Sequence, residues 1–350
     1  MGVIVHLSNV VRRFGKHAAL DHVSLDIVEG EFFSLLGSSG SGKTTLLRII
    51  GGFETPDEGS ILIADMDMRK VPPERRPVNT VFQGYSLFPT MSVFENVAYG
   101  LRVARVERAE RVRRVRLALD LVHMSEFADR SVTTMSGGQT QRVALARAIV
   151  MEPRVLLLDE PLGALDLKLR QAMQVEFKAV QKRLGITFIY VTHDQDEALT
   201  MSDRIGVMNN GRLEQVGSPI DIYRHPRSAF VAAFVGNTNL IEPARDGAGR
   251  PLVNALPASP PREDGPDRLW SIRPEQITVG AAATNSPQRS TGIVEGVVFL
   301  GSQVRYQLRI GEGSHALRII AVAPHTQEML AEGEVTPVGW FPEDIVTVGK

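Results

Sequence analysis

The sequence has 350 residues, of which 43% are hydrophobic and 23% charged, and its formal net charge at pH 7 is −1. This length predicts about two domains, and the near-neutral charge gives no general attraction to nucleic acid or anionic lipid. Because the chain has no cysteine, disulfides, thiol catalysis and cysteine-ligated zinc are excluded.

The first motif along the chain is a glycine-rich loop, GSSGSGKTT, at residues 37–45. It follows the strand-like run EFFSLL and opens an apolar helix that ends at Gly51-Gly52. Its glycines let backbone N–H groups converge on phosphate oxygens, while Lys43 supplies charge to the β- and γ-phosphates and Thr44 a hydroxyl to Mg²⁺. The alternative is a glycine-rich turn that binds nothing. We predict nucleotide binding by Gly37, Ser38, Ser39, Gly40, Ser41, Gly42, Lys43, Thr44 and Thr45.

Seven arginines follow within residues 102–116, in the run RVARVERAERVRRVR. Glu107 and Glu110 partly balance their charge, and we interpret the run as a solvated helix face.

A second glycine motif, MSGGQTQRVALARAI, occupies residues 135–149. Ser136 and Gln139 have the spacing of a capping box, which would satisfy the first N–H groups of a helix. Capping does not explain Gly137 and Gly138, which leave room for a phosphate at the helix N-terminus. The terminal phosphate of one nucleotide scarcely needs two glycine-rich binding sites. We therefore predict that the site at Gly137-Gly138 binds a nucleotide held by another copy of the chain.

An apolar strand that ends in two acids, RVLLLDEP, lies at residues 154–161. In proteins with such a phosphate loop, this strand is expected to run beside the phosphate-loop strand, and its first acid completes the Mg²⁺ shell. Asp159 takes that role, and Glu160 can orient or deprotonate a water for attack on the γ-phosphate. The alternative is two surface acids at a strand end.

Next comes a helix, which ends at Gly185, and then the buried-strand run TFIYVTH at residues 187–193. The helix is indicated by apolar residues at helical spacing: Leu169, Met173, Phe177, Val180 and Leu184. His193 ends the strand at the edge where open α/β sheets bind ligands. No ligand partners at zinc spacing accompany it, so we favour a hydrogen bond to the γ-phosphate.

The alternation of strands and helices predicts a mostly parallel α/β sheet over the first 235 residues. Residues 204–217 are expected to form a hairpin that turns at Asn210-Gly211. A Pro/Gly-rich stretch at residues 242–268 precedes short strand-like runs at 269–279, 292–301 and 304–310, which predict a small all-β barrel or sandwich.

Five motifs in this order resemble the ATP-binding subunit of ABC transporters: the phosphate loop, the SGGQ signature, the LLLDEP strand, the GALD loop and the TH switch. The resemblance implies an α/β P-loop NTPase domain at residues 1–236, with an inserted helical subdomain at about 86–153. It also implies a head-to-tail homodimer, in which ATP held by Lys43 of one subunit is closed over by the other. The closing residues would be Ser136, Gly137, Gly138 and Gln139, with Asp166 also across the interface.

The same resemblance assigns two residues outside these motifs. Gln83, in TVFQGYSLFP, would be a catalytic and Mg²⁺-site residue that links the γ-phosphate to the membrane partners. The apolar segment after it, with Tyr85, Phe88 and Met91, would receive a permease helix. Phe14 matches the aromatic residue on which adenine stacks; the alternative is an ordinary core residue.

Residues 237–350 resemble the regulatory OB-like barrel, or TOBE domain, of bacterial importer ATPases, notably at SIRPEQI (271–277) and FVAAFVGNTNLIEP (230–243). The segment GNTNLI is similar to the corresponding segment of polyamine importers, which carry spermidine and putrescine. The alternative solutes are ferric iron, sulfate or a sugar. Residues 240–350 hold ten basic and thirteen acidic residues, a net charge of −3, which weighs against nucleic acid binding by this barrel.

The importer resemblance implies ATP and Mg²⁺ as cofactors and a peripheral location on the cytoplasmic face of the inner membrane. The partners would be two integral-membrane permease subunits and, indirectly, a solute-binding protein, with no nucleic acid. The apolar runs are far shorter than the roughly 20 residues of a spanning helix, and the N-terminal sequence does not resemble an export signal. Both observations agree with that location. The alternative class is a soluble ABC ATPase that acts on ribosomes or DNA. The 92 residues between Lys43 and Ser136 lack the sustained heptads of a coiled coil.

Overall fold

A computed structural model describes residues 2–163, 165–242, 244–245, 251–252, 268–311, 316–325 and 329–350. The chain divides into two compact units, Met1–Pro219 and Ile220–Lys350. The predicted domain boundary at residue 236 follows the motifs instead, and it stays a prediction. Most of the Pro/Gly-rich stretch at 242–268 lies outside the described residues.

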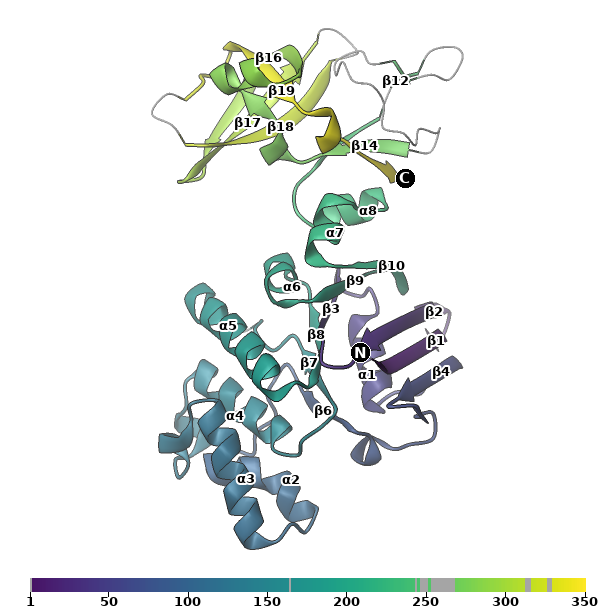
Figure 1. The fold of residues 1–350 in the computed structure, drawn as a ribbon, viewed down its shortest axis with the longest axis vertical. Helices are drawn as coiled ribbons and strands as arrows, with labels where there is room; N and C mark the ends of the chain where they lie inside the picture. Colours follow the sequence, from purple (N-terminus) through teal and green to yellow (C-terminus); the bar gives the residue numbers. More distant parts are fainter. Residues whose placement is uncertain are drawn as a thin grey trace. The chain divides into compact units, whose positions relative to one another are not determined.

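The first unit is built on a six-stranded sheet (Figure 1). Five of its strands are parallel, and the edge strand at residues 212–217 is antiparallel to its neighbour. In sheet order the strands are β10 (Arg212–Gly217), β9 (Arg204–Asn209), β3 (Phe32–Gly37), β8 (Thr187–Thr192), β7 (Val155–Asp159) and β6 (Val78–Val81). The central strands β3 and β8 are buried along their whole length, as expected for parallel strands covered on both faces. The predicted parallel sheet and the hairpin at Asn210-Gly211 are confirmed.

The strand order corrects one expectation. The strand with the two acids, β7, does not run beside the phosphate-loop strand β3, because β8 lies between them and pairs with both. Chain order gives no information about this insertion, since β8 follows β7 in sequence. The carboxyl ends of all three strands still meet at one edge of the sheet.

Helices cover the two faces of this sheet. On one side lie α1 (Lys43–Gly51) and a second, antiparallel sheet made of β2 (His17–Val28), β1 (Val3–Phe14), β4 (Glu58–Ile63) and β5 (Met66–Asp67). On the other side the core includes residues of α2 (Val93–Val103), α3 (Arg108–Leu121), α4 (Gly137–Ile149) and α5 (Leu167–Leu184). Strand β3 serves both cores, since Phe32 packs into the second and Phe33 and Leu35 into the first.

Several helix boundaries agree with the sequence signals. Helix α1 ends at Gly51 with Gly52 in the left-handed region, and α5 ends at Leu184 with Gly185 in the same conformation. These glycines stop a helix without the steric cost that a side chain would bring. The arginine-rich run is divided between the end of α2 and α3. Most of its side chains are exposed, as expected for a solvated face.

The second unit carries two short helices, α7 (Pro219–Arg224) and α8 (Ala229–Phe234), followed by antiparallel sheets. One sheet consists of β11 (Asn239–Ile241), β14 (Arg268–Ile272) and β20 (Val346–Gly349), and β12 (Ala244–Arg245) pairs with β13 (Pro251–Leu252). The larger sheet has the order β15 (Thr278–Val279), β19 (Val335–Trp340), β16 (Gln288–Phe299), β17 (Gln303–Ile310) and β18 (Leu317–Pro324). Trp270 and Trp340 are fully buried in their shared core. The predicted all-β C-terminal domain, OB-like in its curled antiparallel sheet, is confirmed.

Candidate functional site

The glycine-rich loop joins the end of β3 to the start of α1. Gly40 and Gly42 have φ values of 79° and 102°, a region that residues with a side chain rarely adopt. A Cβ atom on Gly37 would lie 2.5 Å from the carbonyl oxygen of Met208 on β9. The glycines therefore allow a tight turn against a neighbouring strand, with α1 starting directly at Lys43.

Lys43 is the buried cation of this loop. Its Nζ atom donates hydrogen bonds to the carbonyl oxygens of Gly37 and Ser38 at 2.9 and 2.8 Å. Burial lowers the pKa of the Lys43 ammonium, although the carboxylates of Glu160 and Asp159 oppose that shift. Its third partner is the Ser41 hydroxyl at 3.4 Å, and a buried ammonium with only neutral hydrogen-bond partners is a favourable position for an incoming anion.

Asp159, at the end of β7, lies close to the first turn of α1. The Thr44 hydroxyl donates to Asp159 Oδ1 at 3.3 Å, across the position of β8. Burial raises the pKa of the Asp159 carboxyl, and the hydrogen bond from Thr44 partly offsets this. A hydroxyl and a carboxylate so close together offer the hard oxygen ligands that Mg²⁺ prefers, with other positions left for water or phosphate. Among the described residues, no cluster of three or more His, Cys, Asp or Glu could hold a metal by itself.

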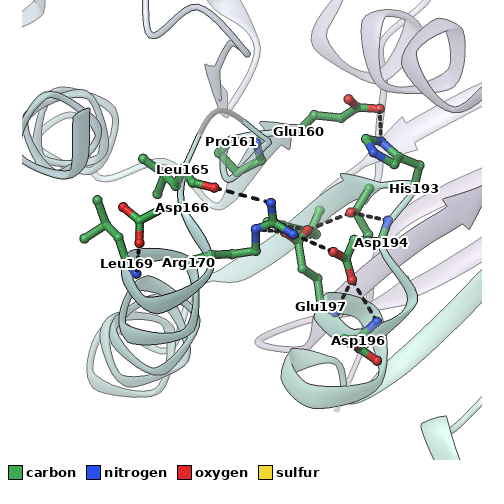
Figure 2. Close-up of polar contacts among 12 residues, drawn as sticks. Glu160, Pro161, Leu165, Asp166, Leu169, Arg170, His193, Asp194, Asp196 and Glu197 are labelled. Carbon is green, nitrogen blue, oxygen red and sulfur yellow. Dashed lines mark hydrogen bonds and ion pairs between the residues drawn. The ribbon is translucent and has the colours of Figure 1, made fainter. Parts of the chain in front are cut away.

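Glu160 and His193 lie at the same edge, one residue beyond β7 and β8 respectively. The backbone of Glu160 has φ 44°, in the left-handed region, and its N–H donates to the Val191 carbonyl at 3.1 Å. Its Oε1 lies 3.2 Å from His193 Nδ1 (Figure 2). Non-glycine residues are uncommon in this region, and Glu160 adopts it directly after β7, beside His193.

The start of α4 forms the predicted capping box. Gln139 Oε1 accepts the Ser136 N–H at 2.9 Å, and Ser136 Oγ accepts the Gln139 N–H at 3.4 Å. The two glycines differ in environment. Gly138 is buried, and a Cβ there would lie 3.0 Å from Leu169 Cδ1, whereas Gly137 is exposed and would meet only Leu165 Cδ2 at 3.4 Å. Packing within the chain therefore accounts for Gly138 and leaves Gly137 unexplained.

Among the described residues, no hydrogen bond or ion pair joins residues 136–139 to the phosphate loop of the same chain. Asp166 behaves in a similar way, because its carboxylate caps α5 by accepting the Leu169 N–H at 3.0 Å. The sequence-predicted residues therefore form one assembled group, at the ends of β3, β7 and β8, and a separate group at the starts of α4 and α5.

Gln83 is exposed in the loop that follows β6. In the same loop, Tyr85 and Ser86 have φ values of 57° and 49°. Arg147 of α4 holds this loop, since its guanidinium donates to the carbonyl oxygens of Tyr85 and Ser86 at 2.7 Å each. Sequence analysis missed Arg147 because one arginine in an amphipathic helix has no distinguishing pattern.

Phe14 is 48% exposed at the end of β1, with the Arg12 guanidinium 4.8 Å from its ring centroid. The alternative interpretation of Phe14 as a core residue is therefore wrong. An exposed ring supported from one side by a cation offers its other face for stacking.

A glycine-rich phosphate loop between a parallel strand and a helix, with an acid from another strand beside its threonine, defines a P-loop NTPase. The family comparisons are more specific. A model described as ABC transporter matches residues 20–163, and one described as TOBE domain matches residues 270–348. The chain belongs to the ABC transporter ATP-binding proteins, a family of ATP-hydrolysing subunits.

Similar proteins cover nearly the whole chain. The spermidine/putrescine import ATP-binding protein PotA of Rubrobacter xylanophilus is 50% identical over 360 residues, covering 99% of this chain and 94% of that protein. The ABC transporter ATP-binding protein YdcT of Escherichia coli, whose name gives no solute, is 46% identical over 350 residues and covers 99% and 98%.

A solved structure of the ATP-binding cassette MJ0796, dimeric in a post-hydrolysis state with ADP and Pi, is 33% identical with a TM-score of 0.55. The match covers 61% of this chain and 98% of that one. No helix in the described part of the chain is long and apolar enough to cross a membrane.

Proposed function

We propose that this protein is the ATP-hydrolysing subunit of an ABC importer for spermidine and putrescine. The observation that carries the solute is the name shared by relatives that are 44–50% identical over 99% of this chain. YdcT is 46% identical, so the level of identity alone leaves ferric iron, sulfate or a sugar as alternatives. The relatives' names favour import over a role on ribosomes or DNA.

ATP binds at the phosphate loop in this proposal. Residues 37–45 surround the phosphates with backbone N–H groups at the start of α1, and Lys43 exchanges its bonds to the Gly37 and Ser38 carbonyls for phosphate oxygens. That exchange is favourable because the buried ammonium gains a charged partner. Phe14 stacks on adenine through its exposed ring.

Thr44 and Asp159 would hold Mg²⁺, with Gln83 reaching the same site from its exposed loop. The 3.3 Å between the Thr44 hydroxyl and the Asp159 carboxylate fits two neighbouring ligand positions on one ion. The ion would neutralise charge on the phosphates. Asp159 gains from it as well, since a cation offsets the burial that raises the pKa of this carboxyl.

Hydrolysis depends on Glu160 and His193. Glu160 orients a water for in-line attack on the γ-phosphate and accepts its proton. His193, 3.2 Å from Glu160, hydrogen-bonds the γ-phosphate. The Glu160 backbone lies in the left-handed region, and its N–H bond to the Val191 carbonyl holds it there.

The active form would be a head-to-tail homodimer. Among the described residues, no hydrogen bond or ion pair joins the start of α4 to its own phosphate loop, and similar cassettes have been solved as dimers. Ser136, Gly137, Gly138 and Gln139 would then contact the γ-phosphate on the partner subunit, with Asp166 beside them. Two permease subunits would contact the loop after Gln83, which puts the protein on the cytoplasmic face of the membrane.

The solute is tested by uptake of labelled spermidine and putrescine into cells that lack this protein. We expect uptake to fall, and to recover when the wild-type chain is supplied but not when Glu160→Gln is supplied. Labelled sulfate and maltose serve as matched solutes that should be unaffected. Unchanged polyamine uptake in a strain without another polyamine system would contradict the assignment.

A further inference from the structure

Arg170, in the first turn of α5, contacts three separate segments at the edge of the sheet (Figure 2). Its guanidinium donates to Asp194 Oδ2 at 2.9 Å and to the Leu165 carbonyl oxygen at 3.3 Å. Its Nε atom lies 3.9 Å from Glu197 Oε1. One side chain thus joins the segment before α5, the turn after β8 and helix α6 (Gln195–Met201).

The turn after β8 is held on both sides of His193. The Asp194 N–H donates to the Thr192 hydroxyl at 2.9 Å, and the Asp194 carboxylate caps α6 by accepting the N–H groups of Asp196 and Glu197. His193 therefore lies between two residues whose backbone positions are fixed. Arg170 fixes the second of them with an ion pair.

Glu197 makes this arrangement rigid. Its side chain is only 4% exposed, and its Oε2 accepts hydrogen bonds from the hydroxyls of Tyr190 and Thr192 at 2.7 and 2.6 Å. A buried carboxylate is costly unless a cation compensates it, and Arg170 is the cation beside it. Removing the guanidinium would leave Glu197 buried with hydroxyl partners alone.

The contact with Leu165 links this network to a second part of the proposed site. Leu165 immediately precedes Asp166, which caps the same helix and is proposed to lie at the dimer interface. We propose that Arg170 is a positioning residue that holds His193 and Asp166 in one arrangement. Hydrolysis on one subunit and closure against its partner would then depend on the same side chain. This inference rests on the proposed function.

The test compares substitutions in the purified full-length chain. Arg170→Met removes the charge and the planar donors, and Arg170→Lys keeps a charge that can serve one acceptor. Lys178→Met is the matched control, because Lys178 is on the same helix, is similarly exposed (22% against 26%) and pairs with Asp203 at 2.6 Å, two turns away from the site. Steady-state MgATP hydrolysis, nucleotide affinity and melting temperature are measured for each.

We expect Arg170→Met to lower kcat by about tenfold to hundredfold, the loss typical of a displaced catalytic group, while KM changes by less than about twofold. Arg170→Lys should lie between it and the wild type. Lys178→Met should keep full kcat even where its melting temperature falls as much as that of Arg170→Met. With Glu160→Gln present, Arg170→Met should also weaken the MgATP-dependent dimer.

An unchanged kcat in Arg170→Met, or an equal loss in Lys178→Met, would overturn the inference and leave the proposed ATPase intact. Failure of the wild-type chain to hydrolyse MgATP, or full activity of Glu160→Gln, would instead overturn the proposed function and the inference together.

Discussion

The two glycines at the start of α4 give the sharpest test, because they should respond to the same substitution in opposite ways. At Gly137 the backbone is helical, and a new Cβ would make only an ordinary contact with Leu165 at 3.4 Å. Gly→Ala at such a position stabilises a protein by about 0.4–1 kcal/mol, chiefly by restricting the unfolded chain. For a unit of this size, that corresponds to a rise in melting temperature of about 1–4 °C.

At Gly138 the new Cβ would lie 3.0 and 3.1 Å from the two terminal carbons of Leu169. Either Leu169 shifts or the start of α4 does, and overpacking of this kind costs about 1–3 kcal/mol. Gly138→Ala should therefore lower the melting temperature. Far-ultraviolet circular dichroism is the appropriate probe, because both tryptophans, Trp270 and Trp340, lie in the second unit and their fluorescence would report on the wrong one.

A measurement of dimer formation distinguishes the effect of these substitutions on packing from their effect on nucleotide binding. In the Glu160→Gln background, MgATP should trap a dimer that light scattering detects after size exclusion. Gly137→Ala should weaken this dimer by at least about tenfold, because the added Cβ would keep the phosphate away from the N–H groups of the first turn, and losing one hydrogen bond to a charged group costs about 1.5–3 kcal/mol. A Gly137→Ala protein that is more stable and dimerises like its parent would refute the idea that a phosphate approaches Gly137.

Three further predictions concern other parts of the chain. Phe14→Ala should weaken ATP binding by about 1–3 kcal/mol, the usual value of stacking on one base, as measured by nucleotide titration. Phe299→Ala, at a phenylalanine of the second unit that is also exposed, should not. Arg147→Met should release the carbonyls of Tyr85 and Ser86, so permease-stimulated hydrolysis in vesicles should fall more than hydrolysis by the isolated chain; equal losses would contradict a coupling role. Burial and the hydrogen bond to Glu275 raise the pKa of Tyr223 to about 12. Because the folded pKa lies above the unfolded one, this stabilisation is complete below pH 10 and is lost as the pH rises towards 12. Phenolate absorbance should show a titration near pH 12 that Tyr223→Phe removes.

Local sequence signals predicted the elements that carry the phosphate-binding group. The loop at residues 37–45, the strand before Asp159 and the strand before His193 each combine an apolar run with a polar terminus, and all appear within a residue or two of their expected bounds. Such runs can be recognised in the sequence because a strand that is buried on both faces is apolar along its whole length. The glycine stops at Gly52 and Gly185 were equally clear, since a left-handed residue after a helix favours glycine.

The pairing of strands and side chains that are far apart in the sequence could not be predicted from local signals. The insertion of β8 between β3 and β7 depends on pairing between strands that are far apart in the sequence. The antiparallel sheet of β1, β2, β4 and β5 went unpredicted because charged and apolar residues alternate irregularly along its bulged strands. Arg170 was missed for a related reason: within α5 it resembles any solvated arginine, and only folding brings Asp194 and Glu197 to it.

The capping box at the start of α4 shows how one motif can serve both folding and ligand binding. Its two hydrogen bonds are unequal, with the Gln139 side chain close to the Ser136 N–H at 2.9 Å and the Ser136 hydroxyl far from the Gln139 N–H at 3.4 Å. A bond at 3.4 Å is near the limit of useful geometry, so Ser136 Oγ can turn to a phosphate at little cost. The shorter bond remains and keeps the first turn of α4 in place. In the proposed dimer, the helix is therefore stable before ATP arrives, and the closing subunit loses little of its own stability when it engages the nucleotide of its partner.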